Sequence, residues 1–233
     1  MTVTEAARFL SNCPSPLVAD TSVVINLIAT GVASSIIEAL PQPLVVVDIV
    51  PAELETGRGR GRMDSARFRE LVNSGIVKIV SLGDLGLEQF CELVVGPAAE
   101  TLDDGEAATI AYAIEQSGVA FIDERKALRI CSVRYRALRV GCTVDLLTHP
   151  NVRARLGQEI LANATFNALQ RGRMSVLPTH LSHVLGLIGS EKAALCESLP
   201  KSIRKSVVSR GSSPGDGEDL KSDTGISGLS PFQ

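Results

Sequence analysis

The sequence has no tryptophan and only 3% aromatic residues, so it offers little surface for stacking bases or sugar rings. Its five cysteines are scattered, odd in number and without a Cys-x-x-Cys pair, which favours free thiols over a disulfide framework. No apolar run reaches the length of a membrane span, and residues 1–15 lack a basic start followed by an apolar stretch. We therefore expect a cytoplasmic protein that makes no contact with a membrane.

Charge of one sign is nearly missing from long stretches of the chain. Residues 1–56 contain six acidic side chains and one basic side chain, and residues 71–124 contain ten acidic and one basic. Five arginines stand in residues 57–70, and residues 125–173 contain ten basic side chains against two acidic ones. An ordinary solvated surface mixes its charges. Acids gathered at one site with arginines around them would suit a metal centre that acts on a polyanion.

Short runs of β-branched residues alternate with helical patterns. Apolar runs predict strands at 16–20, 44–50, 76–82, 119–123 and 139–147. Helical periodicity predicts helices at 22–30, 33–40, 63–74, 84–94, 105–117 and 125–137. Strands that are apolar throughout are typical of a sheet covered on both faces. The alternation therefore predicts an α/β fold, a three-layer α/β/α sandwich with a central, mostly parallel sheet.

The pattern divides the chain into three parts. Residues 1–150 form the expected α/β domain, and residues 151–201 form a helical extension. In the extension, Leu156, Ile160, Leu161, Ala164 and Ala168 fall at helical spacing, so one helix face requires burial against the domain or against a second subunit. Residues 202–233 are rich in Ser, Gly and charge, and we expect them to be a disordered tail.

Four carboxylates stand near the ends of predicted strands. Asp20 ends the first strand, Glu53 follows the second, Glu106 opens the helix before the fourth, and Asp123 ends the fourth. The carboxyl ends of parallel strands form a ligand crevice, so these acids should converge there. Close carboxylates need protons or cations, and hard divalent ions prefer oxygen ligands. Each acid taken alone can also be a helix cap, and the residues leave both interpretations open.

With these residues in view, the chain resembles the PIN-domain family. The similarity covers roughly residues 16–150 and rests on five segments in the family's order: VADTSVVINL, IVPAELETGRG, LDDGEAATIAYA, FIDERKALRIC and GCTVDLL. The resemblance implies a Mg²⁺- or Mn²⁺-dependent ribonuclease, and many members are toxins of toxin–antitoxin pairs. It also implies RNA and an antitoxin protein as partners, and a homodimer.

The resemblance also assigns roles to residues. Asp20, Glu106 and Asp123 become the metal ligands, and Glu53 becomes the fourth catalytic acid, in preference to Glu55. The substrate-binding candidates are Thr21, Ser22, Asn26, Arg58, Arg60 and Arg125. The assisting acids are Asp103, Asp104 and Glu124, of which Glu124 is also the alternative to Asp123. The chain departs from the family at Ile122, where many members have threonine, and in the helical extension.

Two functions follow from these expectations. The first is hydrolysis of an RNA phosphodiester bond by a metal-activated water. The alternative is a catalytically weak PIN-like module that binds nucleic acid or regulates a partner. Loss of metal-dependent RNA cleavage in a variant of Asp20 discriminates between them.

Overall fold

A five-stranded parallel sheet lies at the centre of the fold. The computed structural model describes residues 15–56 and 61–204. The strands are β1 (Leu17–Ala19), β2 (Leu44–Val47), β3 (Val77–Val80), β4 (Val119–Phe121) and β5 (Arg139–Gly141). Their spatial order is β3-β2-β1-β4-β5, and all pairs are parallel. Because the chain leaves central β1 first on one side and later on the other, the carboxyl ends of β1 and β4 border the crevice where ligands bind in such sheets.

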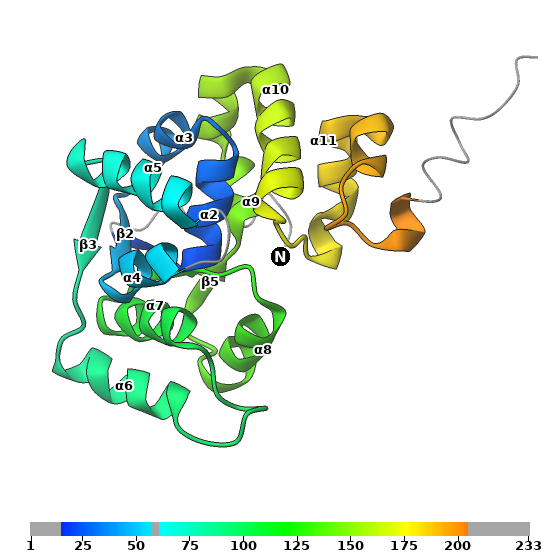
Figure 1. The fold of residues 1–233 in the computed structure, drawn as a ribbon. Coiled ribbons are helices and arrows are strands. Elements are labelled where there is room, and N and C mark those ends of the chain that lie inside the picture. The colour runs from blue at the N-terminus through cyan, green and yellow to red at the C-terminus, as the bar shows by residue number, and fades with distance from the viewer. Residues whose placement is uncertain (1–14, 57–60, 205–233) are drawn as a thin grey trace, which may run out of the picture.

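Helices cover both faces of the sheet (Figure 1). Along β1, Leu17 and Ala19 face one hydrophobic cluster and Val18 faces the other, as the alternation of a strand requires. The Leu17 side is covered by α2 (Thr21–Ala29), α3 (Ala33–Ala39), α4 (Ile49–Thr56), α5 (Gly61–Asn73), α9 (Thr143–Leu147) and α10 (Pro150–Asn167). The Val18 side is covered by α6 (Asp84–Val94), α7 (Asp104–Glu115) and α8 (Arg125–Arg134). The predicted three-layer sandwich is confirmed.

All five strands are shorter than the apolar runs that predicted them, and two of these runs continue into a helix. The run at 139–147 contains β5 and then α9, and the run at 44–50 passes from β2 into α4. At the first break, the Asp145 carboxylate accepts a hydrogen bond from the backbone N of Cys142 at 2.9 Å. This contact turns the chain into a helix, because it satisfies an amide at the helix start. Apolar periodicity alone could not detect that change.

The extension packs onto the domain mainly through α10 and the turn that follows it, and its last helix packs against α10 (Figure 1). It consists of α10, the π-helical turn η1 (Ala168–Gly172), the 3₁₀ turn η2 (Pro178–His180) and α11 (Leu181–Ala194). Leu156, Leu161 and Ala168 belong to the core that also contains Leu17. Ile160 does not pack against the domain, because its side chain is 49% exposed. Gly157 has φ 71° and interrupts α10, so the residues on its two sides do not share one continuous helical face.

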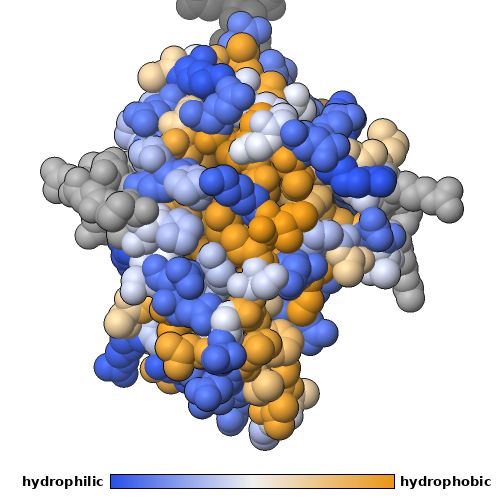
Figure 2. Space-filling model, turned by 90° about the vertical axis from the view of Figure 1, so that its left-hand side faces the viewer, coloured by the Kyte–Doolittle hydropathy of each residue, from blue (hydrophilic) through white to orange (hydrophobic). Residues whose placement is uncertain are grey.

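Large hydrophobic side chains are exposed beside the edge strand of the sheet. Ile79 on β3 and Leu85 and Leu87 on α6 are 44%, 66% and 51% exposed. Figure 2 views the molecule from this side and shows hydrophobic residues among hydrophilic ones. Lys78, also exposed on β3, places a charge on the edge, which disfavours pairing with another strand. Among the described helices, none is by itself long and apolar enough to cross a membrane; only α2 and α3 together, bent by 115°, meet that test.

Candidate active site

A cavity of about 440 Å³ lies where the strand order reverses, at the carboxyl ends of β1 and β4. It brings together the four acids that the sequence placed near strand ends, Asp20, Glu53, Glu106 and Asp123. The other lining residues are Thr21, Ser22, Ile25, Asn26, Asp103, Gly105, Glu124, Gly172, Arg173 and Ser175. Residues from both sides of the sheet and from the extension therefore share one pocket.

Asp20 is both a helix cap and a member of this pocket. One carboxylate oxygen accepts a hydrogen bond from the backbone N of Val23 at 2.8 Å, which satisfies an amide of the first turn of α2. Ser22 Oγ donates to the same carboxylate at 2.9 Å. The side chain is only 3% exposed. The capping contact holds the carboxylate in place and does not remove it from the cavity.

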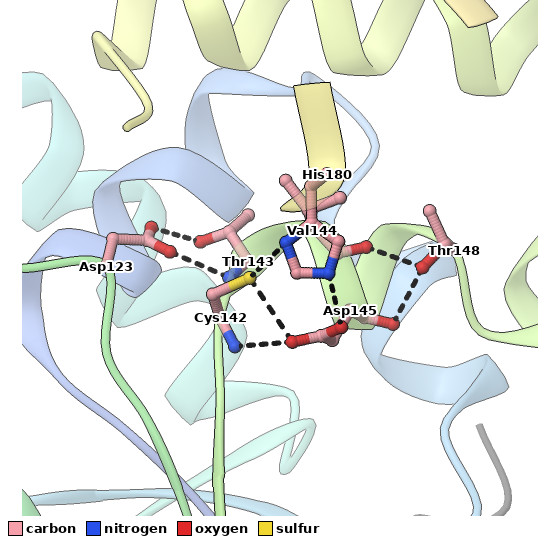
Figure 3. A network of polar contacts seen from close by, with 7 residues as sticks. All are labelled: Asp123, Cys142, Thr143, Val144, Asp145, Thr148 and His180. Carbon is pink, nitrogen blue, oxygen red and sulfur yellow. Dashed lines mark hydrogen bonds and ion pairs between the residues drawn. The ribbon is translucent and has the colours of Figure 1, made fainter. Parts of the chain in front are cut away.

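Asp123 is held by three hydrogen bonds from two neighbouring elements. Asn26 Nδ2 of α2 donates to it at 2.7 Å. Thr143 donates through its backbone N at 2.8 Å and through Oγ1 at 2.5 Å, as Figure 3 shows. Thr143 was missed as a site residue by the sequence analysis, although it lies within the segment GCTVDLL. Thr143 is the second residue after β5, but the apolar run at 139–147 gave no sign that the strand ends at Gly141. At the start of α9, the Thr143 hydroxyl donates to the Asp123 carboxylate that ends the neighbouring strand segment.

Glu53 and Glu106 reach the pocket from two helices that contact each other, α4 and α7. Thr21 Oγ1 donates a short hydrogen bond to the Glu53 carboxylate. Asp103 caps α7 by accepting a hydrogen bond from the backbone N of Glu106 at 3.0 Å. Gly105 lies between the two acids, and a Cβ there would stand 2.9 Å from Glu53 Oε1. A glycine is therefore needed for Glu53 to approach α7 this closely.

Burial and mutual repulsion raise the pKa of Asp20, Asp123 and Glu106. Burial, then the charge of Asp123, raise the pKa of Asp20 well above its usual value, although the bonds from Val23 and Ser22 oppose the shift. Burial also raises the pKa of Asp123, against the bonds from Thr143 and Asn26. For Glu106, burial and the charges of Asp103 and Glu124 raise the pKa to about 7. Near neutral pH the site can therefore exchange a proton for a cation.

Two of the residues predicted for the site lie outside the cavity. Asp104 and Arg125 begin α7 and α8 but do not line the cavity. Arg58 and Arg60 lie outside the described residues. Glu124 lines the pocket edge, where it is exposed and caps α8. Of the two alternatives for the fourth position, Asp123 has the buried, multiply bonded carboxylate.

The donors in this pocket fit a hard divalent cation. Asp20, Glu106 and Asp123 are between 3% and 8% exposed, and none of them forms an ion pair with a lysine or arginine of the described chain; the charge of Lys126 lowers the pKa of Glu106 only in part. Buried carboxylates without a paired cation are stable only when protonated or bound to a cation. Their oxygens are the ligands that Mg²⁺ and Mn²⁺ prefer.

A second polar cluster lies behind Thr143 and combines Cys142, Asp145 and His180 (Figure 3). Its ligand atoms lie within 4.8 Å of one another, so the three side chains could hold a metal ion. However, the two ring nitrogens of His180 face different partners: Nε2 lies 3.1 Å from Asp145, and Nδ1 lies 3.7 Å from Cys142 Sγ. Burial and the charge of Asp145 raise the pKa of the Cys142 thiol well above its usual value, so the thiol stays neutral. We interpret the cluster as a polar contact between α9 and the extension.

Comparison with known proteins agrees with this architecture. A family model described as a PIN domain matches residues 16–190, which include the sheet, the acidic pocket and most of the helical extension. Members of this family are generally nucleases and usually use divalent metals. No curated protein and no solved structure matches the chain. The match extends over most of the sequence, and the chain belongs to the PIN-domain family.

Proposed function

We propose that the protein is a Mg²⁺- or Mn²⁺-dependent endoribonuclease that hydrolyses RNA phosphodiester bonds. One observation carries this proposal: three buried carboxylates, without a lysine or arginine partner in the described chain, converge in one cavity with raised pKa values. Gathering buried carboxylates lowers the stability of the folded protein, and binding of a cation offsets that loss. RNA as the substrate follows from the family, most of whose members are ribonucleases.

Each residue of the pocket would have its own role in this reaction. Asp20, Glu106 and Asp123 would hold a divalent ion, which supplies a Lewis acid and lowers the pKa of a bound water. Glu53, half-buried and fixed by Thr21, would orient the attacking water and accept its proton. Ser22 and Asn26 line the pocket and fix the positions of Asp20 and Asp123. Because Glu106 has a pKa of about 7, the proposed site requires deprotonation for metal binding.

For the cellular role, we propose the toxin of a toxin–antitoxin pair, acting as a homodimer and inhibited by an antitoxin protein. A small DNA-binding protein encoded next to this chain would support that role. The alternative remains a binding or regulatory module that uses the same pocket without turnover, and the following experiment separates the two.

A metal titration tests the proposed function directly. Mn²⁺ should raise the melting temperature of the wild-type protein at millimolar concentration or below, because the ion binds the folded pocket and not the unfolded chain. The rise should be larger at pH 8 than at pH 6, since Glu106 carries a proton below about pH 7 that the ion must displace. Cleavage of single-stranded RNA, followed on a gel, should have the same metal and pH dependence.

Glu106→Gln serves as the matched variant for this titration. It removes one raised-pKa carboxylate, so its apo form should be at least as stable as wild type at pH 8, while its response to Mn²⁺ should weaken. Metal that stabilises the wild type without RNA cleavage would favour the binding module. A wild-type melt indifferent to both Mn²⁺ and Mg²⁺ would refute the metal site itself.

Gly105→Ala should damage the site without damaging the fold. The new methyl group would displace the end of the Glu53 side chain, which is flexible, and would break its hydrogen bond with Thr21. Alanine also favours a helix over glycine by ~0.5–1 kcal/mol, so the melting temperature should hold or rise. We expect RNA cleavage to fall by roughly 10–100-fold, the range for loss of an outer contact at a metal site.

Gly186→Ala is the control for that substitution. Gly186 lies in α11, and a Cβ there would meet nothing within 4 Å. This variant should gain helix stability and keep full activity. Equal activity of Gly105→Ala and wild type would remove Glu53 from the proposed reaction.

A further inference from the structure

The extension brings its own residues into the acidic pocket at the end of η1. This turn packs against α2, and its Ala168 and Leu169 are buried. Gly172 then passes so close to α2 that a Cβ would lie 3.2 Å from both Asn26 Cα and Ala29 Cβ. The contact places the next residue, Arg173, on the wall of the pocket.

Arg173 is held there in an unfavourable backbone conformation. Its φ of 58° and ψ of 34° are left-handed, a region where glycine is normally found after a helical turn. Met174 is fully buried and Val176 is 4% exposed, so the following chain is anchored in the core. Side chains in such conformations concentrate at functional sites. The position therefore tolerates arginine at a cost that glycine would avoid.

The charge of Arg173 is opposite to that of its surroundings. Six acids line the same cavity, namely Asp20, Glu53, Asp103, Glu106, Asp123 and Glu124, and Arg173 is the one basic residue among the described lining residues. Its side chain is exposed and makes no hydrogen bond or ion pair with a described residue. An arginine that served only to neutralise the acids would pair with one of them. Its five N–H donors are instead available to a ligand.

We propose that Arg173 binds a phosphate group of the nucleic-acid substrate beside the acidic pocket. This inference rests on the proposed nuclease function and adds a substrate-binding residue from outside the α/β unit. A nucleic acid that binds at this pocket brings phosphate groups close to six acidic side chains, which repel them. A fixed positive charge nearby offsets this repulsion, and a guanidinium group can bind two phosphate oxygens at once. A phosphate bound at Arg173 would hold the adjacent phosphodiester over the acids.

Three substitutions of this residue separate a substrate role from a structural one. RNA binding is measured with a labelled single-stranded RNA in Ca²⁺, with a gel to confirm that the RNA stays intact, across a range of salt concentrations. Arg173→Ala should bind about tenfold more weakly, and the slope of log affinity against log salt should fall in magnitude by ~0.7, the value for one lost phosphate contact on a single strand. Arg173→Lys should keep the slope and recover part of the affinity, because lysine retains the charge but not the two-oxygen geometry.

Arg173→Gly gives the most discriminating result. Glycine suits the left-handed backbone, so this variant should melt at a higher temperature than wild type and still lose RNA affinity. Arg171→Ala is the control, because Arg171 is exposed two residues earlier and does not line the pocket.

The outcomes distinguish this inference from the proposed function. If wild type cleaves RNA while Arg173→Ala matches its affinity, salt slope and KM, the role of Arg173 is refuted and the nuclease stands. If wild type binds RNA without cleaving it, the proposed nuclease function is refuted. The salt dependence of RNA affinity in the Arg173 variants then still tests whether Arg173 binds a phosphate. A wild type that binds no RNA refutes both.

Discussion

Asp20→Asn is expected to lower metal-dependent RNA cleavage by more than about 100-fold, beyond the 10–100-fold that loss of an outer-shell contact costs. The melting temperature of the metal-free protein should stay the same or rise. The amide oxygen of asparagine can still accept the hydrogen bond from the Val23 amide, so α2 keeps its cap. The substitution also removes a carboxylate that burial and Asp123 force to a raised pKa.

The pH dependence of stability gives an independent reading of the same variant. A carboxyl group whose pKa is raised by folding binds protons more readily in the folded state. It therefore lowers the stability of the metal-free wild type as pH rises from the unfolded pKa toward the folded pKa. Asp20→Asn should flatten this decline, as followed by thermal melts from pH 5 to pH 8 without metal.

Asp84→Asn is the matched control for both measurements. Asp84 is also an acid at a helix N-terminus, but it is exposed on α6 and outside the pocket. It should leave cleavage and the pH profile unchanged. An Asp20→Asn protein that cleaves RNA as well as wild type would leave Asp20 with the role of a helix cap alone.

The opening of the pocket could be predicted from sequence because it depends on topology. Asp20 and Asp123 each follow an apolar run, and parallel pairing of β1 with β4 then necessarily brings the two strand ends together. The apolar runs and their alternation with helical patterns were enough to infer a parallel sheet whose strand ends lie along one edge, but the neighbouring position of β1 and β4 came from the structure. Glu53 and Glu106 entered through the same reasoning with the help of the family's motifs.

The partners of these acids could not be predicted in the same way. Thr143 contacts Asp123 because β5 lies next to β4 and the chain turns into α9 directly after Gly141. The apolar run at 139–147 hid that turn, since a buried strand and a buried short helix have similar composition. The position of Arg173 was even harder to predict from the sequence. It depends on the close packing of Gly172 against Asn26 of α2, which lies 146 residues earlier in the chain than Gly172.

The extension shows a similar limit. Its apolar residues indicated that one helix face must be buried, but the spacing could not say whether the domain or a second subunit covers it. The left-handed backbone at Gly157 also changed which residues face inward, and Ile160 became exposed as a result. Leu156 and Leu161 on either side of the break are buried in the main core.

A chain that ends at residue 150 should therefore fail to fold, although the α/β pattern of the sequence is complete at that point. Ending there removes a set of core side chains that includes Leu156, Leu161, Leu169 and Met174. Full burial of each such side chain is worth ~1.5–3 kcal/mol, and a whole domain is stable by only ~5–15 kcal/mol. The truncation also uncovers the apolar surfaces of α2 and α3 that these residues cover, and it removes His180 from its buried contact with Asp145. We expect insoluble or aggregated protein on expression, checked by size-exclusion chromatography of the soluble fraction.

A single substitution in the extension gives a measurable loss of stability even where the truncated chain yields no soluble protein. Met174→Ala removes a fully buried side chain next to Arg173 and should lower the free energy of unfolding by ~2–5 kcal/mol, measured by urea denaturation. A chain that ends at residue 204 retains all of these contacts and is the matched control for the shorter chain. A 1–150 protein that is monodisperse and cleaves RNA would show that neither the core contributed by the extension nor Arg173 is needed, because the same deletion removes both.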